Sequence, residues 1–215
     1  MNQSRFIYRG GEAQIEEKKS RFIATVAPVR SEEEAQAFLA GIKKKYWDAR
    51  HNCYAFVTGP GGRLQRSSDD GEPQGTAGRP ILEVIRGAGV EDCSVGVTRY
   101  FGGILLGTGG LVRAYQKAAR EGLEACGIAE RTQGYRLYIR TDYTDIGRLQ
   151  YLFAQKGWQV ENTEYAEAVT TELLVAEDEL GPVRDAVTES TGGRAVISPE
   201  EAVCFARTDE GTLFF

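Results

Sequence analysis

The sequence predicts an α+β protein with two domains. Short runs of alternating polar and apolar residues, typical of strands, are interleaved with longer runs whose apolar residues recur at helical spacing. Apolar residues make up 41% of the 215 residues and charged residues 27%, the composition of a globular chain that can bury a core. The order of the elements changes near residues 129–133, so we expect domains at residues 1–131 and 132–215.

Charge is divided unevenly between the two halves. Residues 1–130 contain 18 Lys/Arg and 16 Asp/Glu, a net charge of +2, whereas residues 131–215 contain 8 and 15, a net charge of −7. The formal charge of −5 for the whole chain argues against indiscriminate binding to nucleic acid or to an anionic membrane, because such binding needs a basic surface. We therefore expect only the first half to face phosphate. The acidic second half is either a solvated face or a surface for a different partner.

The first domain is expected to alternate between strands and helices. Ser31 and Glu34 form a capping-box pattern at the start of a helix that ends at a lysine triplet. Pro80 suits the first turn of a second helix, and Thr108 is the expected N-cap of a third, which Gly127 ends. In chain order we predict strands near 12–16 and 21–26, a helix at 31–46, strands at 51–58 and 63–68, a helix at 80–88, a strand at 93–100 and a helix from residue 108.

The second domain has a different order of elements. The pattern is strand, helix, two strands, helix and final strands, which is the ferredoxin-like split arrangement. The predicted elements are a strand at 135–141, a helix carrying Ile146, Leu149 and Phe153, strands at 158–163 and 169–176, a helix carrying Leu180, Val183 and Val187, and strands through Val196 and Phe205.

Cysteine spacing and the absence of long apolar segments, of the kind that form a signal or a membrane span, indicate a reduced, cytoplasmic protein. The four cysteines lack the paired spacing of zinc or thiol redox sites. The first ten residues do not read as a hydrophobic signal segment, and we find no apolar run of roughly eighteen residues that would span a bilayer. We expect no membrane partner.

Two glycine-rich stretches are the expected working surface. The first glycine-rich stretch is DDGEPQGTAGRP, residues 69–80, and the second glycine-rich stretch is TRYFGGILLGTGGLVRAY, residues 98–115. Glycine at this density costs conformational entropy and lets backbone N–H groups approach a ligand closely.

Part of the second stretch is suited to an anion. Gly107, Thr108, Gly109 and Gly110 lie between a strand and a helix, where unpaired N–H groups and the positive end of the helix dipole converge. Neither the Walker pattern nor the dinucleotide fingerprint is present. The alternative is a tight strand-to-helix packing turn with no ligand.

Two arginines flank these glycines. Arg99 and Arg113 could both hydrogen-bond a phosphate in fork geometry. The alternative is that each pairs with a carboxylate of the first stretch and pins the two stretches together. Those carboxylates are Asp69, Asp70 and Glu72.

An aromatic pair precedes the first two glycines of the second glycine-rich stretch. Tyr100 and Phe101 lie beside Gly102 and Gly103, where a ring could stack on a base. Tyr100 is the better stacking candidate if it points outward, because core packing is the commoner fate of a phenylalanine at a strand end.

Metal and nucleophilic chemistry have little support. The acidic run lacks the spacing of a calcium loop, and His51 is the sole histidine of the chain. A lone histidine at the start of a strand is more often structural than catalytic, and no Ser or Cys is tied to it by spacing. We therefore predict no catalytic residue, metal or cofactor.

Four segments resemble the IMPACT/YigZ family. They are KSRFI at residues 19–23, HNCYAF at 51–56, SDDGEPQGTAGRPIL at 68–82, and the second glycine-rich stretch. The resemblance implies an N-terminal fold similar to the second domain of a small-subunit ribosomal protein and to galactokinase-type kinases. It implies a C-terminal domain similar to the last domain of the translocation elongation factor. Eukaryotic relatives regulate translation under stress by binding an activator of an initiation-factor kinase through an additional domain.

One position departs from the family pattern. This chain has Leu105 where the family commonly has lysine, so a positive charge is missing from the expected anion site.

The leading hypothesis is a non-enzymatic, translation-associated regulator that binds RNA, the ribosome or a translation-related protein. The alternatives are a phosphate- or nucleotide-binding enzyme that uses residues 107–110 with Asp69 or Asp70, in which case the ligand is a small phosphate compound, and a pure protein-interaction module. The predicted binding residues are Arg21, His51, Asp69, Asp70, Glu72, Gly75, Thr76, Arg79, Arg99, Tyr100, Gly102, Gly103, Gly107, Thr108, Gly109, Gly110 and Arg113.

Overall fold

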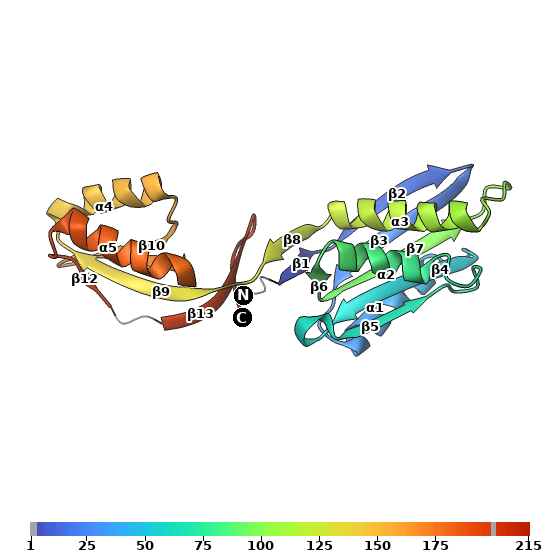
Figure 1. Cartoon of the computed structure of the whole chain (residues 1–215), viewed down its shortest axis with the longest axis horizontal. Helices are drawn as coiled ribbons and strands as arrows, with labels where there is room; N and C mark the ends of the chain where they lie inside the picture. The colour runs from blue at the N-terminus through green and yellow to red at the C-terminus, as the bar shows by residue number, and fades with distance from the viewer. Residues whose placement is uncertain (1–3, 199–200) are drawn as a thin grey trace. The chain divides into compact units, whose positions relative to one another are not determined.

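The computed structural model describes residues 4–198 and 201–215. The chain has a mixed α+β structure and divides into two compact units, Met1–Glu130 (unit 1) and Arg131–Phe215 (unit 2). Figure 1 labels their helices and strands.

Unit 1 is built on a five-stranded antiparallel sheet with the order β2-β3-β7-β4-β5. The central strand is β7, which pairs with β3 on one side and β4 on the other. The segment 51–58, expected to be central, is the interior strand β4 beside it. The strands are β2 (Gly11–Glu17), β3 (Ser20–Pro28), β4 (His51–Thr58), β5 (Leu64–Ser68) and β7 (Cys93–Tyr100), with the 3₁₀ turn η1 (Pro60–Gly62) between β4 and β5.

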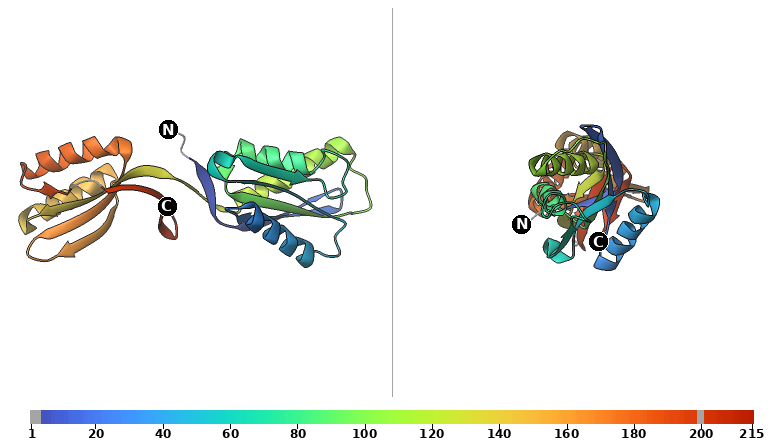
Figure 2. Two further views of the ribbon diagram at one scale, coloured as in Figure 1. Left: turned by 90° about the horizontal axis from the view of Figure 1, so that it is seen from below. Right: turned by 90° about the vertical axis from the view of Figure 1, so that its right-hand side faces the viewer.

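Helices cover both faces of this sheet. Helix α1 (Glu32–Lys45) packs on one face, and α2 (Gly78–Gly87) and α3 (Thr108–Glu124) lie side by side on the other (Figures 1 and 2). Successive residues of a strand point to opposite faces, so Ala55 of β4 joins the core under α2 and α3 whereas Phe56 packs under α1. This explains why β4 is apolar at consecutive positions.

A small three-stranded sheet in unit 1 was not predicted. Its order is β6-β1-β8, and its strands have only five, two and four residues in chain order. Runs this short carry too little periodicity to be recognised. The strands are β1 (Arg5–Arg9), β6 (Val90–Glu91) and β8 (Gly127–Glu130).

The helix starts differ in how well their residues predicted them. The Ser31 hydroxyl accepts from the Glu34 N–H at 3.2 Å, which confirms the expected cap of α1. The prediction of Thr108 as the N-cap of α3 is wrong, because Gly107 holds that position and Thr108 is the first helical residue. Gly107 has a φ of +71°, which glycine adopts without the strain a side chain would add.

Unit 2 contains a second antiparallel sheet, with the order β10-β11-β9-β13-β14 and the short β12 beside β9. Helices α4 and α5 share one core with this sheet, where Phe153 and Val187 pack with Leu137. The strand predicted from residue 135 begins at Thr132. The elements are β9 (Thr132–Thr141), α4 (Tyr143–Lys156), β10 (Val160–Tyr165), β11 (Val169–Ala176), η2 (Glu177–Glu179), α5 (Leu180–Thr191), β12 (Val196–Ile197), β13 (Glu201–Thr208) and β14 (Gly211–Phe214).

Within residues 4–198 and 201–215, no helix combines the length and the hydrophobicity that crossing a bilayer requires.

The close pairing of β9 and β11 predicts the effect of a single methyl group. A Cβ on Gly134 would lie 2.1 Å from the carbonyl oxygen of Val175, so Gly134→Ala should lower the free energy of unfolding by about 2 kcal/mol. Gly41 of α1 is the control, because a Cβ there meets nothing within 4 Å. Gly41→Ala should be neutral or stabilising by up to about 1 kcal/mol. Urea unfolding measures both variants, and equal stabilities would contradict the observed pairing.

Candidate binding site at the end of the unit 1 sheet

Strand pairing brings the two glycine-rich stretches to one end of the unit 1 sheet. Strand β3 begins and β7 ends at this end, because Arg21 pairs with Tyr100. Strand β4 begins there as well, since His51 pairs with Arg99. The ring nitrogen Nδ1 of His51 lies 2.9 Å from the carbonyl oxygen of Asp70, which fixes the first stretch beside the second.

A buried ion pair joins the two stretches. Arg99 Nη1 donates to Glu72 Oε1 at 2.7 Å, and the side chains are only 7% and 3% exposed. Tyr115 Oη donates to the same carboxylate oxygen at 2.8 Å, and Cys53 Sγ lies 3.3 Å from that hydroxyl. Burial raises the pKa of Tyr115 and raises the pKa of Cys53 to about 12, so both groups keep their protons at neutral pH. Arg99 thus pins the two stretches together, which is one of the two roles expected for it.

Asp69 holds the first glycine-rich stretch against the start of α2. Its Oδ2 accepts from the N–H of Gly75 at 2.7 Å, and its Oδ1 accepts from the N–H groups of Ala77 and Gly78 at 3.0 and 2.8 Å. Burial alone would raise the pKa of this carboxyl, but the three backbone donors outweigh burial and lower it. Both carboxylate oxygens are therefore occupied by the fold.

Asp70 is also occupied. Its carboxylate accepts from Lys43 Nζ at 2.9 Å and from the N–H of Asn52 at 2.7 Å. The backbone at Asp70 and Gly71 is left-handed, with φ of +41° and +84°, which forms the turn expected of an Asp-Gly pair. Thr76 donates its hydroxyl to the carbonyl of Pro73 at 2.7 Å. The first glycine-rich stretch is thus held by hydrogen bonds within the loop and by partners on α1 and β4.

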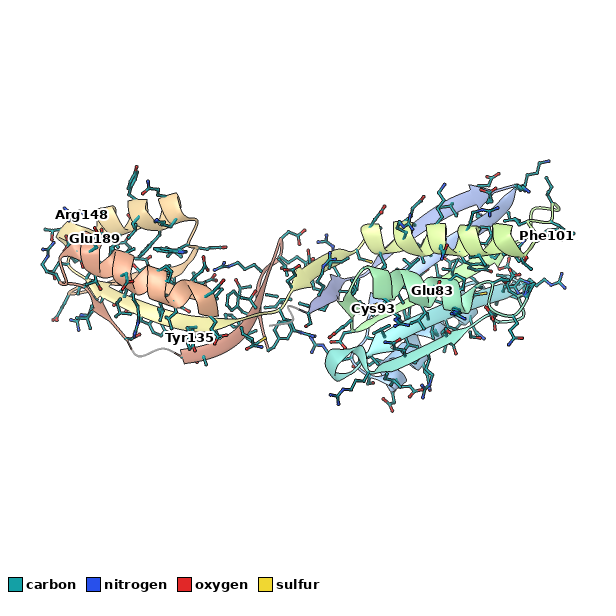
Figure 3. The ribbon with its side chains drawn as sticks, viewed as in Figure 1. Glu83, Cys93, Phe101, Tyr135, Arg148 and Glu189 are labelled. Atoms are coloured by element: carbon teal, nitrogen blue, oxygen red, sulfur yellow. The ribbon has the colours of Figure 1, made fainter. Side chains whose placement is uncertain are left out.

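The part of the second stretch that follows β7 is exposed. We call residues 101–107 the tip loop; Phe101, Ile104 and Leu105 are 50%, 43% and 83% exposed. Gly102 fixes the base of this loop, because its N–H donates to Ser20 Oγ at 3.2 Å and a Cβ there would lie 2.0 Å from the Lys19 carbonyl. Figure 3 shows Phe101 at the end of unit 1 where β7 ends.

A basic pocket lies beside the tip loop. Its volume is about 260 Å³, and its walls are one side of the first turns of α3 and the β2–β3 turn. Neither Lys18 nor Arg113 forms an ion pair within the described part of the chain. The first N–H groups of α3 follow Gly107 and have no side-chain cap. The lining residues are Glu17, Lys18, Leu106, Gly110, Arg113, Ala114 and Lys117.

Other predicted binding residues have local partners. The Tyr100 hydroxyl donates to Asp48 at 2.7 Å, and the Arg21 guanidinium lies 4.5 Å from the centre of the Tyr100 ring. Arg79, which is well exposed, pairs with Glu83 one helical turn along α2. Arg79 does not line the basic pocket.

Sequence reasoning missed Lys18 and Lys117. Lys18 is in the tight β2–β3 turn, with a φ of +46°, and Lys117 lies two turns into α3. Each is an ordinary exposed lysine in the sequence, and only the approach of the β2–β3 turn to α3 gives them a shared pocket. The Lys-Lys pair at the KSRFI segment was the one available signal.

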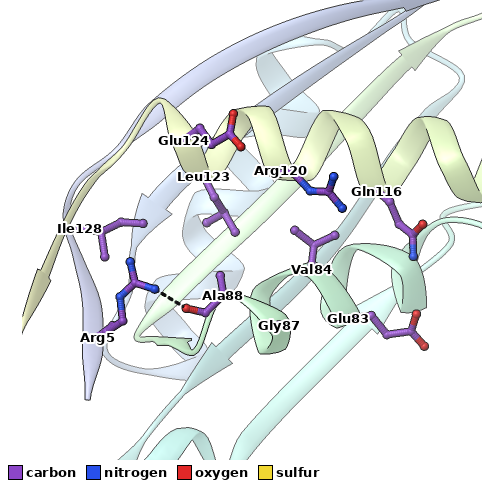
Figure 4. A pocket seen from close by; sticks show the side chains of 10 residues that line it. All are labelled: Arg5, Glu83, Val84, Gly87, Ala88, Gln116, Arg120, Leu123, Glu124 and Ile128. Carbon is purple, nitrogen blue, oxygen red and sulfur yellow. Dashed lines mark hydrogen bonds between the residues drawn. The ribbon is translucent and has the colours of Figure 1, made fainter. Parts of the chain in front are cut away.

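A second pocket, of about 510 Å³, lies between α2 and α3 (Figure 4). Arg5 and Arg120 line it together with Glu83 and Glu124, so its formal charges balance. Arg5 already donates to the carbonyl of Ala88 at 2.8 Å. This pocket therefore lacks the excess positive charge of the pocket beside the tip loop.

Removing one partner of the buried ion pair should destabilise unit 1. Glu72→Ala leaves the Arg99 charge and the Tyr115 hydroxyl without their partner, so the free energy of unfolding should fall by about 3 kcal/mol. Glu124→Ala, which removes an exposed carboxylate at the end of α3, is the matched control and should change stability by less than about 0.5 kcal/mol. Urea unfolding measures the stability of both variants. Equal stability of Glu72→Ala and Glu124→Ala would contradict this account.

Asp69 should make stability depend on pH. Because its folded pKa lies below the ordinary value of 3.8, Asp69 contributes stability that is present above the unfolded pKa and is lost as the pH falls through the folded pKa. Asp69→Asn should therefore be less stable than the unmodified protein near neutral pH, by about 1 kcal/mol, and the gap should narrow in acid. Urea unfolding at a series of pH values from neutral down into acid tests this trend. Asp185→Asn, on the exposed face of α5, is the control. A gap that stays constant with pH would count against the proposed role of the Asp69 carboxylate.

Comparisons with known proteins cover both units. The Impact N-terminal domain matches residues 18–123, and a domain of unknown function, DUF1949, matches residues 139–194. A solved protein described as a hypothetical protein is 31% identical, with a TM-score of 0.58 over 94% of this chain and 98% of that one.

Named relatives come from bacteria and animals. The IMPACT family member YvyE of Bacillus subtilis is 41% identical over 91% of this chain and 90% of its own length. The IMPACT family member YigZ of Escherichia coli is 39% identical over 69% of this chain and 74% of its own length. Protein IMPACT of the mouse is 39% identical, but the match covers 43% of this chain and 30% of the mouse protein. The chain described here belongs to the IMPACT family.

Proposed function

We propose that this protein is a translation-associated, non-enzymatic regulator that binds RNA at the basic pocket beside the tip loop. The observation that carries this proposal is the pair of cations, Lys18 and Arg113, that face one pocket without carboxylate partners in the described part of the chain. The lining carries three cations against the single carboxylate of Glu17, and one of the cations, Lys117, lies 3.9 Å from Glu121. Because the chain as a whole has a net charge of −5, a pocket with a surplus of positive charge is a local exception to its surface. The family relationship adds support, because eukaryotic members regulate translation.

The chemistry of the pocket suits a phosphate. Arg113 offers a fork of N–H donors, Lys18 offers a mobile point charge, and the first turn of α3 adds backbone N–H groups and the positive end of its dipole. Leu105 supplies no charge where relatives commonly have lysine. We therefore expect few phosphate contacts, and binding that weakens moderately with salt.

We also propose the finer fold assignments that the family resemblance implies. Unit 1 would be similar to the ribosomal-protein second domain, and unit 2 would be a ferredoxin-like domain, with the boundary between residues 131 and 132. The order β10-β11-β9-β13, with α4 and α5 as the two connections that cover one face, supports the assignment of unit 2. A role at the ribosome would place the protein in the cytoplasm.

The test removes the two pocket cations together. We expect Lys18→Ala with Arg113→Ala to weaken binding of a short single-stranded RNA about tenfold. The slope of log affinity against log salt concentration should become shallower by about 0.7 for each phosphate that the variant no longer neutralises. Fluorescence anisotropy at several salt concentrations measures both quantities.

The matched control removes two cations elsewhere in unit 1. Lys44 of α1 and Arg86 of α2 are exposed and do not line the pocket. Lys44→Ala with Arg86→Ala should leave affinity and salt slope nearly unchanged. Equal decreases in the two double variants would reduce the effect to net charge and would remove the basis for this site.

A further inference from the structure

We infer that Phe101 is a stacking platform for an unpaired base of the RNA, an assignment that rests on the proposed function and specifies which RNA the site takes. The Phe101 ring is half exposed on the tip loop at the end of unit 1 (Figure 3). A base presents a π-face regardless of its sequence, and stacking on an aromatic side chain is the usual way in which proteins hold unpaired bases.

The ring is backed by a fixed group. The Arg99 guanidinium lies 5.6 Å from the centre of the Phe101 ring and 5.5 Å from that of Phe22. Glu72 holds Arg99 in place through the buried ion pair. Phe101 therefore lies on a rigid support, and the exposed part of its ring faces away from the core. A platform that is already ordered loses little entropy when a base stacks on it.

The structure selects Phe101 over Tyr100, which the sequence favoured. The Tyr100 ring is covered by the Arg21 guanidinium at 4.5 Å, and its hydroxyl is bound to Asp48. A base would have to displace Arg21 to stack there. Phe101 has no such cover on its exposed side among the residues that the structure describes.

The platform and the basic pocket are neighbours. Lys18 of the β2–β3 turn lines the pocket. Directly after this turn, the hydroxyl of Ser20 accepts a hydrogen bond from the N–H of Gly102, the residue that follows Phe101. The turn therefore lines the pocket and packs against the base of the tip loop that carries Phe101. A base on Phe101 and a phosphate in the pocket would belong to one strand or to adjacent nucleotides, which favours a single strand because its bases are free to turn outward.

The apolar tip loop determines how such a strand would be read. Ile104 and Leu105 are exposed but have no side-chain groups that hydrogen-bond to base edges. We therefore expect the site to distinguish unpaired from paired RNA while tolerating different base sequences. A partner protein with an apolar hollow is the competing occupant of the Phe101 surface, and the test below distinguishes it from single-stranded RNA.

The test compares three substitutions of Phe101 in the full chain. Phe101→Ala removes the ring, Phe101→Leu keeps an apolar side chain without a π-face, and Phe101→Trp enlarges the π-face. We expect the first two to weaken binding of a single-stranded oligouridylate by about tenfold, and Phe101→Trp to bind at least as tightly. A duplex RNA of the same length should be bound equally by all four proteins.

Controls keep the outcome interpretable. Tyr151→Ala removes an exposed aromatic ring from α4, outside the proposed site, and should leave oligouridylate binding unchanged. Thermal unfolding checks each variant, and Phe101→Leu retains a cover over Arg99. The fluorescence of Phe101→Trp should be quenched by oligouridylate more strongly than that of the unmodified protein, whose signal comes from Trp47 and Trp158, and the difference reports stacking at residue 101.

The possible outcomes distinguish the platform from the proposed function. If the Lys18/Arg113 variant loses affinity but no Phe101 variant does, the platform is overturned and RNA binding stands. If Phe101→Leu binds like the unmodified protein while Phe101→Ala does not, the contact is apolar rather than stacking, which favours the protein occupant and overturns the inference. If the unmodified protein binds neither RNA, both the platform and the proposed function fail.

Discussion

The ion pair between Glu72 and Arg99 is the interaction on which the binding site depends. It joins the first glycine-rich stretch, a loop outside the sheet at Glu72, to the end of β7, which sheet pairing with β3 and β4 holds in place. An unpaired charge at this depth would be costly, so the two residues constrain each other. Tyr115 adds a hydrogen bond to the same carboxylate from α3. The start of the first stretch, the end of β7 and α3 are thereby held in one arrangement.

The carboxylates and the cations have separate roles in this arrangement. Asp69, Asp70 and Glu72 bind backbone N–H groups, Lys43 and Arg99, and thus form the internal supports of the loop. Lys18 and Arg113 remain without such partners in the residues that the structure describes. With these three acids turned inward, the pocket lining keeps three cations against one carboxylate, Glu17, although the chain as a whole is acidic. This separation favours an anionic partner at the pocket.

Regular elements could be predicted from the sequence to the extent that their apolar spacing was long enough to recognise. The strands at 51–58 and 93–100 were predicted with their observed bounds, because the first contains the apolar run CYAFV and the second alternates apolar Cys93, Val95 and Val97 with small residues. The β6-β1-β8 sheet could not be predicted, because its strands are short and depend on partners far away in the chain. For the site, the convergence of the two glycine-rich stretches was expected. The choice of Arg99 as an internal support, and the contribution of Lys18, arise from tertiary contacts that no local pattern encodes.

The most direct test is an NMR titration of the isotopically labelled full chain with a single-stranded oligouridylate. The account predicts chemical-shift changes centred on the backbone amides of the β2–β3 turn, the tip loop and the first turn of α3, with saturation as the RNA is added. Shifts confined to unit 2, or spectra that do not change at any RNA concentration, would contradict the claim that this end of the unit 1 sheet is the binding site.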